Sequence, residues 1–342
     1  SYVVPPAYIQ KNGGAVFARK PIGTGPYRVT EFIPDDRVTM QATPDYWRGK
    51  PAIDTVIWRS IPDSTARIAA LLSGEVQLVE TVPAGLAPTV TADSKLRLVR
   101  VRHGGLTIYL GLKTAEKPLD DVRVRRALSL AIDRKTIVAR ILKGYASLTG
   151  TQAGPFDFGY KNEPIPAFDP AKAKALLAEA GYPNGFSIRM QVPARYLNST
   201  DVGQVIAQEF GAIGVKANLD VPDWSVYTQE VPAGKQAPIY MLAWGSTQTL
   251  DADAALYPIF RSGQPYSTVH FPAIDKLLDQ SRQTIDPKAR AAIFGQIQDL
   301  AVKDVPVLTL YQEDSLYAEQ KDVDFAGRAD ARIPVFNIRL TH

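Results

Sequence analysis

The sequence predicts an α/β protein, and three features of the chain point to this class. Segments with alternating or β-branched residues dominate the first hundred positions. From residue 107 onward, short apolar strands alternate with longer segments in which apolar residues recur on a helical period. Most of these longer segments begin at an aspartate or end at a glycine, as helices do. Because strands that alternate with helices form helix-covered parallel sheets, we expect a mainly parallel sheet.

The first hundred residues contain four predicted strands and one helix. The strands are GPYRVTEF, DRVTMQA, TVIWRSI and LRLVRVR, separated by Pro, Gly or Asp. The helix covers about 65–72, because Ser64 is a suitable N-cap, Ile68 and Leu71 share one face, and Gly74 follows.

The glycine-rich stretch PIGTGPY at 21–27 raises the question of a phosphate-binding loop. It lacks both the lysine with Ser or Thr of a P-loop and the G-x-G-x-x-G spacing of a dinucleotide fold. Pro26 cannot donate to a ladder, and the residues after it suit a strand. The stretch is therefore predicted to be a turn that starts a strand.

The remainder of the chain alternates between strands and helices. The predicted strands are TIYLGL, SIRMQV, VKANLDV, IYMLAW and VLTLY, and the predicted helices cover 120–143, 170–181, 201–214, 273–283 and 287–303. Asp169-Pro170 and Asp286-Pro287 each place a capping side chain before a proline at the first helical position. The connection from Gly150 to Pro170 is long, and such loops are usually functional or packed as a distinct feature.

Composition excludes several classes of protein. The chain has 342 residues, 45% of them hydrophobic, which is enough for about two or three domains. The net charge of +4 is spread along the chain without a basic block, so a nucleic-acid partner is not expected. There is no cysteine and only three histidines, so disulfides, thiolate metal sites and cysteine nucleophiles are excluded. No apolar run approaches the roughly 18 residues of a membrane span, so the chain is not expected to be an integral membrane protein.

Taken together, seven segments resemble the extracellular solute-binding proteins of family 5, which serve ABC importers. In chain order these are IGTGPY with PDYWRGKP, LLSGEVQLVE, DDVRVRRALSLAIDR, FDPAKAKALLAEAGYPNGF, GAIGVKA, AWG, and the run from IDKLLDQ at 274 to VLTLY at 311. Each motif is weak alone, but seven in the same order span nearly the whole chain.

The resemblance implies a two-lobed periplasmic binding protein of type II that closes around its ligand by hinge motion. We expect 1–109 to be a partial lobe I, 110–311 to be lobe II, and 312–342 to return to lobe I. Since IGTGPY lies deep inside family members but begins here near residue 21, a signal peptide and the N-terminal part of lobe I are expected to be absent from this chain. The segments 107–112 and 310–313 are hinge candidates, and two core strands are the competing interpretation.

The implied function is capture of a small peptide or related amino-acid conjugate in the cleft between the lobes, and its delivery to the permease subunits of an ABC importer. The resemblance further implies a periplasmic or membrane-anchored extracellular location and a monomer. It implies no catalytic residue, no metal and no cofactor.

The resemblance also suggests ligand-binding residues around the segment AWG at 243–245. Trp244 resembles the aromatic residue that lines the family's peptide cleft, and Gly245 follows it. Peptide binders carry a carboxylate three residues after that tryptophan, which binds the ammonium group of the peptide, but this chain has Thr247 there. Either Asp251 replaces that carboxylate, or the ligand has no amine at this point. The competing role is capping, because Asp251 or Asp253 could cap the segment ADAALYPIF.

Two further residues are candidates with open alternatives. Tyr109 corresponds to family tyrosines near the cleft wall, and a core tyrosine is the competing interpretation. Lys113 stands where the family often has asparagine, so it would favour an anionic ligand group near the cleft mouth. A solvated lysine is the competing interpretation.

Alternative functions remain at this point. The same fold can bind a non-peptide solute such as an opine, a sugar or a metal chelate, and it can serve a sensor or a chaperone. An enzyme of another class is the third alternative, because LDAD at 250–253 contains the D-x-D pattern of metal-dependent glycosyltransferases. That pattern is short and is common by chance.

Overall fold

The computed structural model describes residues 4–196, 198–330 and 332–341. The chain divides into two compact units. The first contains the described residues up to Arg100, Leu316–Gly327 and the described residues from Arg332 onward. The second contains Val101–Ser315 and 328–330.

The first unit contains short helices and small antiparallel sheets. In chain order its elements are α1 (Pro6–Asn12), α2 (Gly14–Arg19), β1 (Tyr27–Ile33), β2 (Arg37–Ala42), β3 (Thr55–Arg59), α3 (Ser64–Leu72), β4 (Leu78–Val79), α4 (Ala87–Ala92), β5 (Leu96–Val101), β12 (Ser315–Gln320), β13 (Val323–Asp324), the 3-10 helix η2 (Val335–Asn337) and β14 (Arg339–Leu340). The strands form sheets of order β1-β2-β3, β4-β12-β5 and β13-β14. The residues of PIGTGPY before Tyr27 form a bend that leads into β1, so the predicted turn is confirmed.

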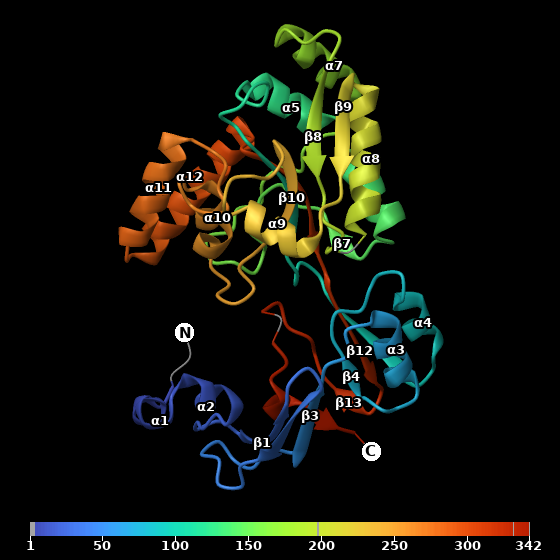
Figure 1. Ribbon diagram of the computed structural model, residues 1–342, viewed down its shortest axis with the longest axis vertical. Coiled ribbons are helices and arrows are strands. Elements are labelled where there is room, and N and C mark those ends of the chain that lie inside the picture. The colour runs from blue at the N-terminus through green and yellow to red at the C-terminus, as the bar shows by residue number, and fades with distance from the viewer. Residues whose placement is uncertain (1–3, 197, 331, 342) are drawn as a thin grey trace. The chain divides into compact units, whose positions relative to one another are not determined.

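The second unit contains a six-stranded sheet with helices on both faces (Figure 1). In chain order its elements are β6 (Thr107–Leu112), α5 (Val122–Leu130), α6 (Arg134–Thr136), the π-helix η1 (Ile137–Ile141), β7 (Ala146–Ser147), α7 (Pro170–Glu179), β8 (Phe186–Gln191), α8 (Ser199–Ala212), β9 (Val215–Asp220), α9 (Trp224–Glu230), β10 (Ile239–Trp244), α10 (Ala252–Phe260), α11 (Pro272–Gln283), α12 (Pro287–Asp304) and β11 (Val307–Glu313).

The strand order of this sheet is β7-β11-β6-β10-β8-β9. Its β10–β8 and β8–β9 pairs are parallel, whereas β10–β6, β11–β6 and β11–β7 are antiparallel. The expected mainly parallel sheet is therefore wrong. β6 enters the sheet directly after the chain comes from the other unit, and it runs against both of its neighbours.

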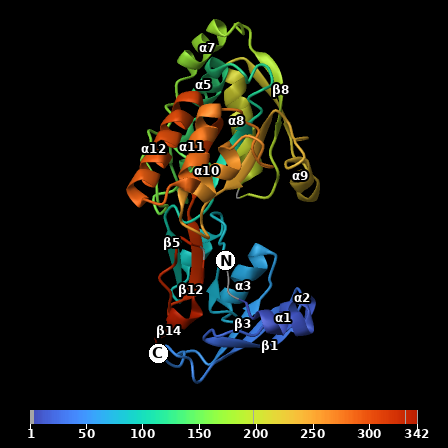
Figure 2. The ribbon, with the colours of Figure 1, turned by 90° about the vertical axis from the view of Figure 1, so that its left-hand side faces the viewer.

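The alternation of side chains along β6 and β10 builds a separate core on each face of the sheet. Ile108 and Met241 belong to one core, which α5, α7 and α8 cover. Tyr109 and Leu242 belong to the other, which α9, α10, α11 and α12 cover. Figure 2 faces the layer of α10, α11 and α12. Strands buried on both faces are uniformly apolar, as IYMLAW and TIYLGL are.

Several predicted helix starts are confirmed because they depend on local chemistry. Asp169 accepts a hydrogen bond from Lys172 N at 2.9 Å, and Asp286 accepts one from Ala289 N at 2.8 Å. The predicted cap of the first helix is wrong by one residue. Asp63, rather than Ser64, caps α3 by accepting from Ala66 N at 2.7 Å.

The predicted single helix over 120–143 is interrupted. Asp133 starts a new helix by accepting a hydrogen bond from Thr136 N at 3.0 Å. The side chain of Arg134 turns into the core and donates to the carbonyl of Ser129 at 2.8 Å, so it binds the end of α5. A buried charge that needs these carbonyls is the physical reason for the break.

The segments 107–112 and 310–313 are confirmed as core strands, because they lie in β6 and β11 within the second unit. The chain passes from one unit to the other between Arg100 and Val101, and again between Ser315 and Leu316. The identification of the two units with the two lobes stays a prediction.

Candidate functional site

The candidate site lies at the end of β10, where this buried strand leads into a polar loop. Trp244 is the last residue of the strand and is half-buried, whereas the residues before it are buried. It pairs with Thr107 at the start of β6, and Thr107 pairs with Gln312 near the end of β11. The end of β10, the start of β6 and the end of β11 therefore lie together.

Trp244 provides an aromatic surface whose orientation is fixed on two sides. Its indole Nε1–H donates to the carbonyl oxygen of Ala254 at 2.9 Å. Its ring packs on that of Tyr266, with 4.8 Å between the centroids and an interplanar angle of 45°. Such aromatic pairs contribute about 0.5–1.5 kcal/mol beyond the area that they bury. The two half-buried rings form an ordered wall.

The loop after Trp244 is folded back by its own backbone. The N–H groups of Thr249 and Leu250 both donate to the carbonyl oxygen of Ser246, at 2.8 and 2.7 Å. Thr247, the position at which peptide binders carry a carboxylate, is half-buried within this turn. The two hydrogen bonds to Ser246 O fix the backbone at Thr247, and the side chain at this position is uncharged.

Gly245 is packed closely against the residue that directly precedes β6. A Cβ at Gly245 would lie 3.2 Å from the side chain of Leu106, which is closer than most contacts allow. The residue beside Trp244 is small because the backbone approaches a neighbour here.

Asp157 is a buried carboxylate bonded to the same loop. The hydroxyl of Ser246 donates to its Oδ1, and the N–H of Gly154 donates to its Oδ2 at 2.8 Å. Burial raises the pKa of Asp157, these two hydrogen bonds counteract the rise, and the charge of Asp251 adds to it. Since an unpaired buried carboxylate is costly, the side chain holds Ser246 firmly.

Phe158 binds the other end of the loop through its backbone. Its N–H donates to the carbonyl oxygen of Leu250 at 2.8 Å, and its carbonyl oxygen accepts from Ala252 N at 3.0 Å. The long connection from Gly150 to Pro170 thus includes a segment that fixes the loop after Trp244.

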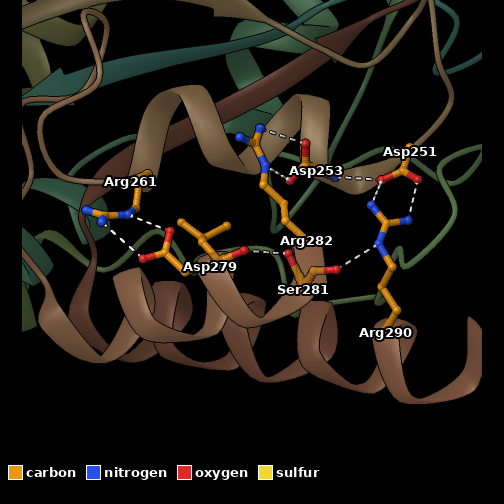
Figure 3. Close-up of polar contacts among 8 residues, drawn as sticks. Asp251, Asp253, Arg261, Asp279, Ser281, Arg282 and Arg290 are labelled. Atoms are coloured by element: carbon orange, nitrogen blue, oxygen red, sulfur yellow. Dashed lines mark hydrogen bonds and ion pairs between the residues drawn. The ribbon is translucent and has the colours of Figure 1, made fainter. Parts of the chain in front are cut away.

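Asp251 and Asp253 are both bound by arginines (Figure 3). Asp251 accepts from Arg290 at 2.6 and 2.9 Å and caps α10 through the N–H of Asp253 at 2.9 Å. Asp253 accepts from Arg282 at 2.9 Å through each oxygen. The capping role of Asp251 is confirmed. Its role as an anchor for a ligand amine stays a prediction, and both of its oxygens already have partners.

Tyr109 lies inside the core of the second unit and is completely buried. Its phenol has no hydrogen-bond partner among the described residues, and burial raises its pKa well above the usual value. The core interpretation therefore agrees with the geometry. Contact with a ligand requires its neighbours to move and stays a prediction.

Lys113 is not brought together with Trp244. It follows the last residue of β6, and its N–H donates to the carbonyl oxygen of Pro238, before the start of β10, at 3.0 Å. Because β6 and β10 are antiparallel, Lys113 and Trp244 lie at opposite ends of this strand pair. The ammonium of Lys113 forms an ion pair with Glu116 at 3.4 Å. Lys113 and Trp244 are therefore not neighbours, and a role for Lys113 near the mouth of a ligand cleft stays a prediction.

Sequence reasoning did not identify three residues beside this loop. Tyr266 lies in an irregular segment, and Asp157 lies in the long connection, where only the length of the loop gave a signal. Tyr196 is the third. Burial raises its pKa to about 12, the Ala243 backbone opposes this, and Glu313 and Tyr266 act in the same direction as burial.

The D-x-D pattern at 250–253 has no metal geometry in the described part of the chain. No group of three or more histidine or acidic side chains is gathered there to hold a metal ion. Both carboxylates of the pattern are bound by arginines instead. Among the described residues, no helix is both long enough and apolar enough to cross a membrane.

Comparison with known proteins identifies the family. A family model described as bacterial extracellular solute-binding proteins, family 5 Middle, matches residues 1–267. The chain belongs to this family. Its fold is that of the two-lobed periplasmic binding proteins, with mixed helices and sheets.

Three relatives of this family 5 chain are informative. The glutathione-binding protein GsiB of Salmonella typhimurium is 30% identical over 332 residues, which cover 94% of this chain and 64% of GsiB. The structure of DppA from Helicobacter pylori with the peptide STSA is 25% identical, with a TM-score of 0.81, and covers 99% of this chain and 68% of DppA. AgaA from A. tumefaciens R10 with agropinic acid is 28% identical, with a TM-score of 0.77, and covers 99% of this chain and 71% of AgaA.

The family 5 chain spans 64% of the length of the curated relatives that it matches first.

Proposed function

We propose that this protein is the substrate-binding component of an ABC importer. It captures a small peptide or related amino-acid conjugate and delivers it to the permease subunits. The protein acts as a monomer in the periplasm or, if lipid-anchored, at the outer face of the membrane, and it performs no chemistry. Membership of family 5 supports this function, as does the similarity to proteins named for glutathione and peptide binding.

The observation that carries the proposal is the ordered pair of Trp244 and Tyr266 at the end of β10. Ligand sites in α/β proteins gather where strands end, and they combine aromatic walls with a few fixed polar groups. The backbone of Ser246–Leu250 supplies such polar groups in a turn that Asp157 fixes. We assign Trp244, Gly245 and Thr247 to ligand contact, with Asp157 and Asp251 holding the loop.

The ligand class follows from the absence of a carboxylate at Thr247. The two acids that follow it most closely in the sequence, Asp251 and Asp253, are bound by Arg290 and Arg282, and the buried Asp157 beside Ser246 accepts from Ser246 and Gly154. A ligand whose amine is acylated or otherwise shielded at this point fits this site better than an ordinary free-amine peptide. A non-peptide conjugate such as an opine is the second candidate, because AgaA was solved with agropinic acid.

The test is native mass spectrometry of the full-length protein purified from its own periplasm, followed by denaturation to release any bound mass. A ladder of peptide masses or a single amino-acid conjugate is the expected result. Trp244→Ala should then weaken binding of the identified ligand by at least tenfold, as truncation of a central aromatic contact does.

Trp47→Ala is the matched control, because Trp47 is 77% exposed in the other unit. Equal loss of affinity in both variants, or a released ligand that is neither peptide nor amino-acid derived, would overturn the assignment.

A further inference from the structure

The second unit contains a cavity of about 550 Å³ that the ligand site described above does not use. It lies between α5, α7, the end of α12 and the loop 164–167, and its inner wall includes Val307 and Thr309 of β11. Cavities of this size match those that hold small molecules.

This cavity is separate from the site at Trp244. Val307 pairs with Gly111 toward the end of β6, whereas Trp244 pairs with Thr107 at its start. These positions are four residues apart on β6, or about 13 Å along the strand. The cavity adjoins both cores at this end of the sheet, because Leu130 and Leu176 pack on the core beneath α5 and α7, whereas Val307 belongs to the core beneath α10 and α12.

One wall of the cavity is apolar and exposed to solvent. Ile165 is 42% exposed and Val302 is 40% exposed. Leu130, Leu176 and Val305 continue this surface inward and pack on the core. A clustered apolar surface that solvent reaches marks a binding site more often than isolated apolar residues do.

The charged residues that line the cavity are both cations. Arg126 and Lys172 are exposed at its rim, and no carboxylate is among the lining residues in the described part of the chain. Lys172 has no ion-pair partner among the described residues, and Arg126 donates a hydrogen bond from Nη2 to the carbonyl oxygen of Lys303 at 2.6 Å. The rim is therefore complementary to an anion.

The packing of α5 against α7 places both cations on the same side. Arg123 at the start of α5 donates to the carbonyl oxygen of Glu179 at the end of α7, at 2.7 Å. Leu130 at the end of α5 accepts from Asp169 N, before the start of α7, at 2.8 Å. The helices are thus antiparallel, and Lys172 lies beside the last turns of α5, which also carry Arg126.

A buried cation lies beneath the polar part of the lining. Arg134 is 2% exposed and donates from Nη2 to Ser129 Oγ at 3.1 Å and from Nε to the carbonyl oxygen of Thr309 at 2.7 Å. Among the described residues, its hydrogen-bond partners are all neutral oxygens. Ser129 and Thr309 both line the cavity, so a positive charge lies beneath its floor; the carboxyl of Glu209 is a charged neighbour of Arg134 but forms no hydrogen bond with it among the described residues.

We propose that this cavity is a second binding site, for an amphipathic carboxylate with an aliphatic chain. The chain lies on the wall formed by Ile165, Val302 and Val305, and the carboxylate binds Lys172 and Arg126. This inference is independent of the ligand proposed for the site at Trp244.

The test is isothermal titration of the full-length protein with hexanoate, octanoate and decanoate, and with octanol for comparison. Saturable binding of one octanoate per chain is expected, and each added methylene should tighten binding by up to about fourfold. Lys172→Gln and Arg126→Gln should each weaken octanoate by about two- to fivefold, as loss of an exposed ion pair does. Octanol should bind more weakly than octanoate.

Matched controls separate this site from general surface charge. The two control variants are Lys174→Gln and Arg140→Gln. Lys174 lies on the same helix as Lys172 but does not line the cavity, and Arg140 is an exposed arginine outside the lining. Both should bind octanoate as the unmodified protein does. Val302→Glu should abolish binding without lowering the thermal midpoint, since Val302 is on the exposed side of α12.

Trp244→Ala should leave octanoate binding unchanged, because that side chain belongs to the other site. The proposal is overturned if octanoate does not bind saturably, if octanol binds as tightly, or if Lys174→Gln weakens binding as much as Lys172→Gln. It is also overturned if Val302→Glu still binds octanoate.

Discussion

Arg290 on α12 binds Asp251 at the start of α10 through two parallel hydrogen bonds of 2.6 and 2.9 Å (Figure 3). The same guanidinium packs over the rings of Phe158 and Phe294, with 5.4 and 4.8 Å to their centroids. One ion pair thus joins a helix, a helix cap and the connection that holds the loop after Trp244. Bidentate pairs of this kind fix geometry as well as contributing energy.

We expect Arg290→Met to lower the free energy of unfolding by about 2 kcal/mol. A fully buried pair costs roughly 3–5 kcal/mol when one partner is removed, and this pair is partly exposed. Urea unfolding measures the change. Arg140→Met, which removes an exposed arginine without a described ion pair, should change stability by less than about 0.5 kcal/mol. Equal effects in the two variants would show that the pair with Asp251 contributes nothing.

The hydrogen bond from Ser246 to Asp157 should couple the loop to the core of the second unit. We expect Ser246→Ala to cost about 1.5–3 kcal/mol, because it removes a hydrogen bond to a buried carboxylate. In a double-mutant cycle with Asp157→Asn, the two effects should deviate from additivity by about 1 kcal/mol. Thr249→Val is the control, because the long 3.3 Å bond from its hydroxyl to Ser246 O is half-exposed. Strictly additive losses would contradict the coupling.

The parts of the fold that the sequence predicts correctly are those that depend on neighbouring residues. Asp169-Pro170 and Asp286-Pro287 define helix starts because a cap and a proline act within one turn. The capping role of Asp251 was predictable for the same reason.

The errors concern contacts between distant parts of the chain. Nothing near β6 reveals that it pairs antiparallel with both β10 and β11, and this pairing makes the expected mainly parallel sheet wrong. The break after α5 requires Arg134 to reach Thr309 on β11. Arg290 and Asp251 likewise meet only through the packing of α12 on α10, so the charge partner of Asp251 could not be predicted from spacing.

Substitution by alanine should change the free energy of unfolding in opposite directions at two glycines. A Cβ at Gly111 in β6 would overlap the ring of Tyr240, so Gly111→Ala should cost about 2–3 kcal/mol. Gly211 lies in α8 with open space around it, so Gly211→Ala should stabilise the protein by about 0.5–1 kcal/mol. Thermal and urea unfolding of both variants measure the contrast. A neutral Gly111→Ala would mean that Tyr240 has room to move.

Glu209 on α8 should make stability depend on pH above the range usual for a carboxylate. Burial raises its pKa from 4.5 to about 7, and the charge of Asp133 adds to the rise, whereas the Asp133 N–H bond and Arg134 oppose it. The folded state therefore favours the protonated form. The stabilising contribution is complete below about pH 4.5 and is lost as the pH rises through about 7.

Glu209→Gln keeps the oxygen that accepts from Asp133 N but cannot ionise. The difference in the free energy of unfolding between this variant and the unmodified protein should shift in favour of the variant by about 1 kcal/mol from pH 5 to pH 8. Solvent screening keeps this shift small, because the side chain is half-exposed. Urea unfolding at pH 5, 6, 7 and 8 measures the difference. Glu179→Gln, at an exposed position on α7, should show a constant difference across this range. If Glu209→Gln also shows a constant difference, then Glu209 titrates in the folded protein as it does in the unfolded chain, and burial of its second oxygen does not favour the protonated form.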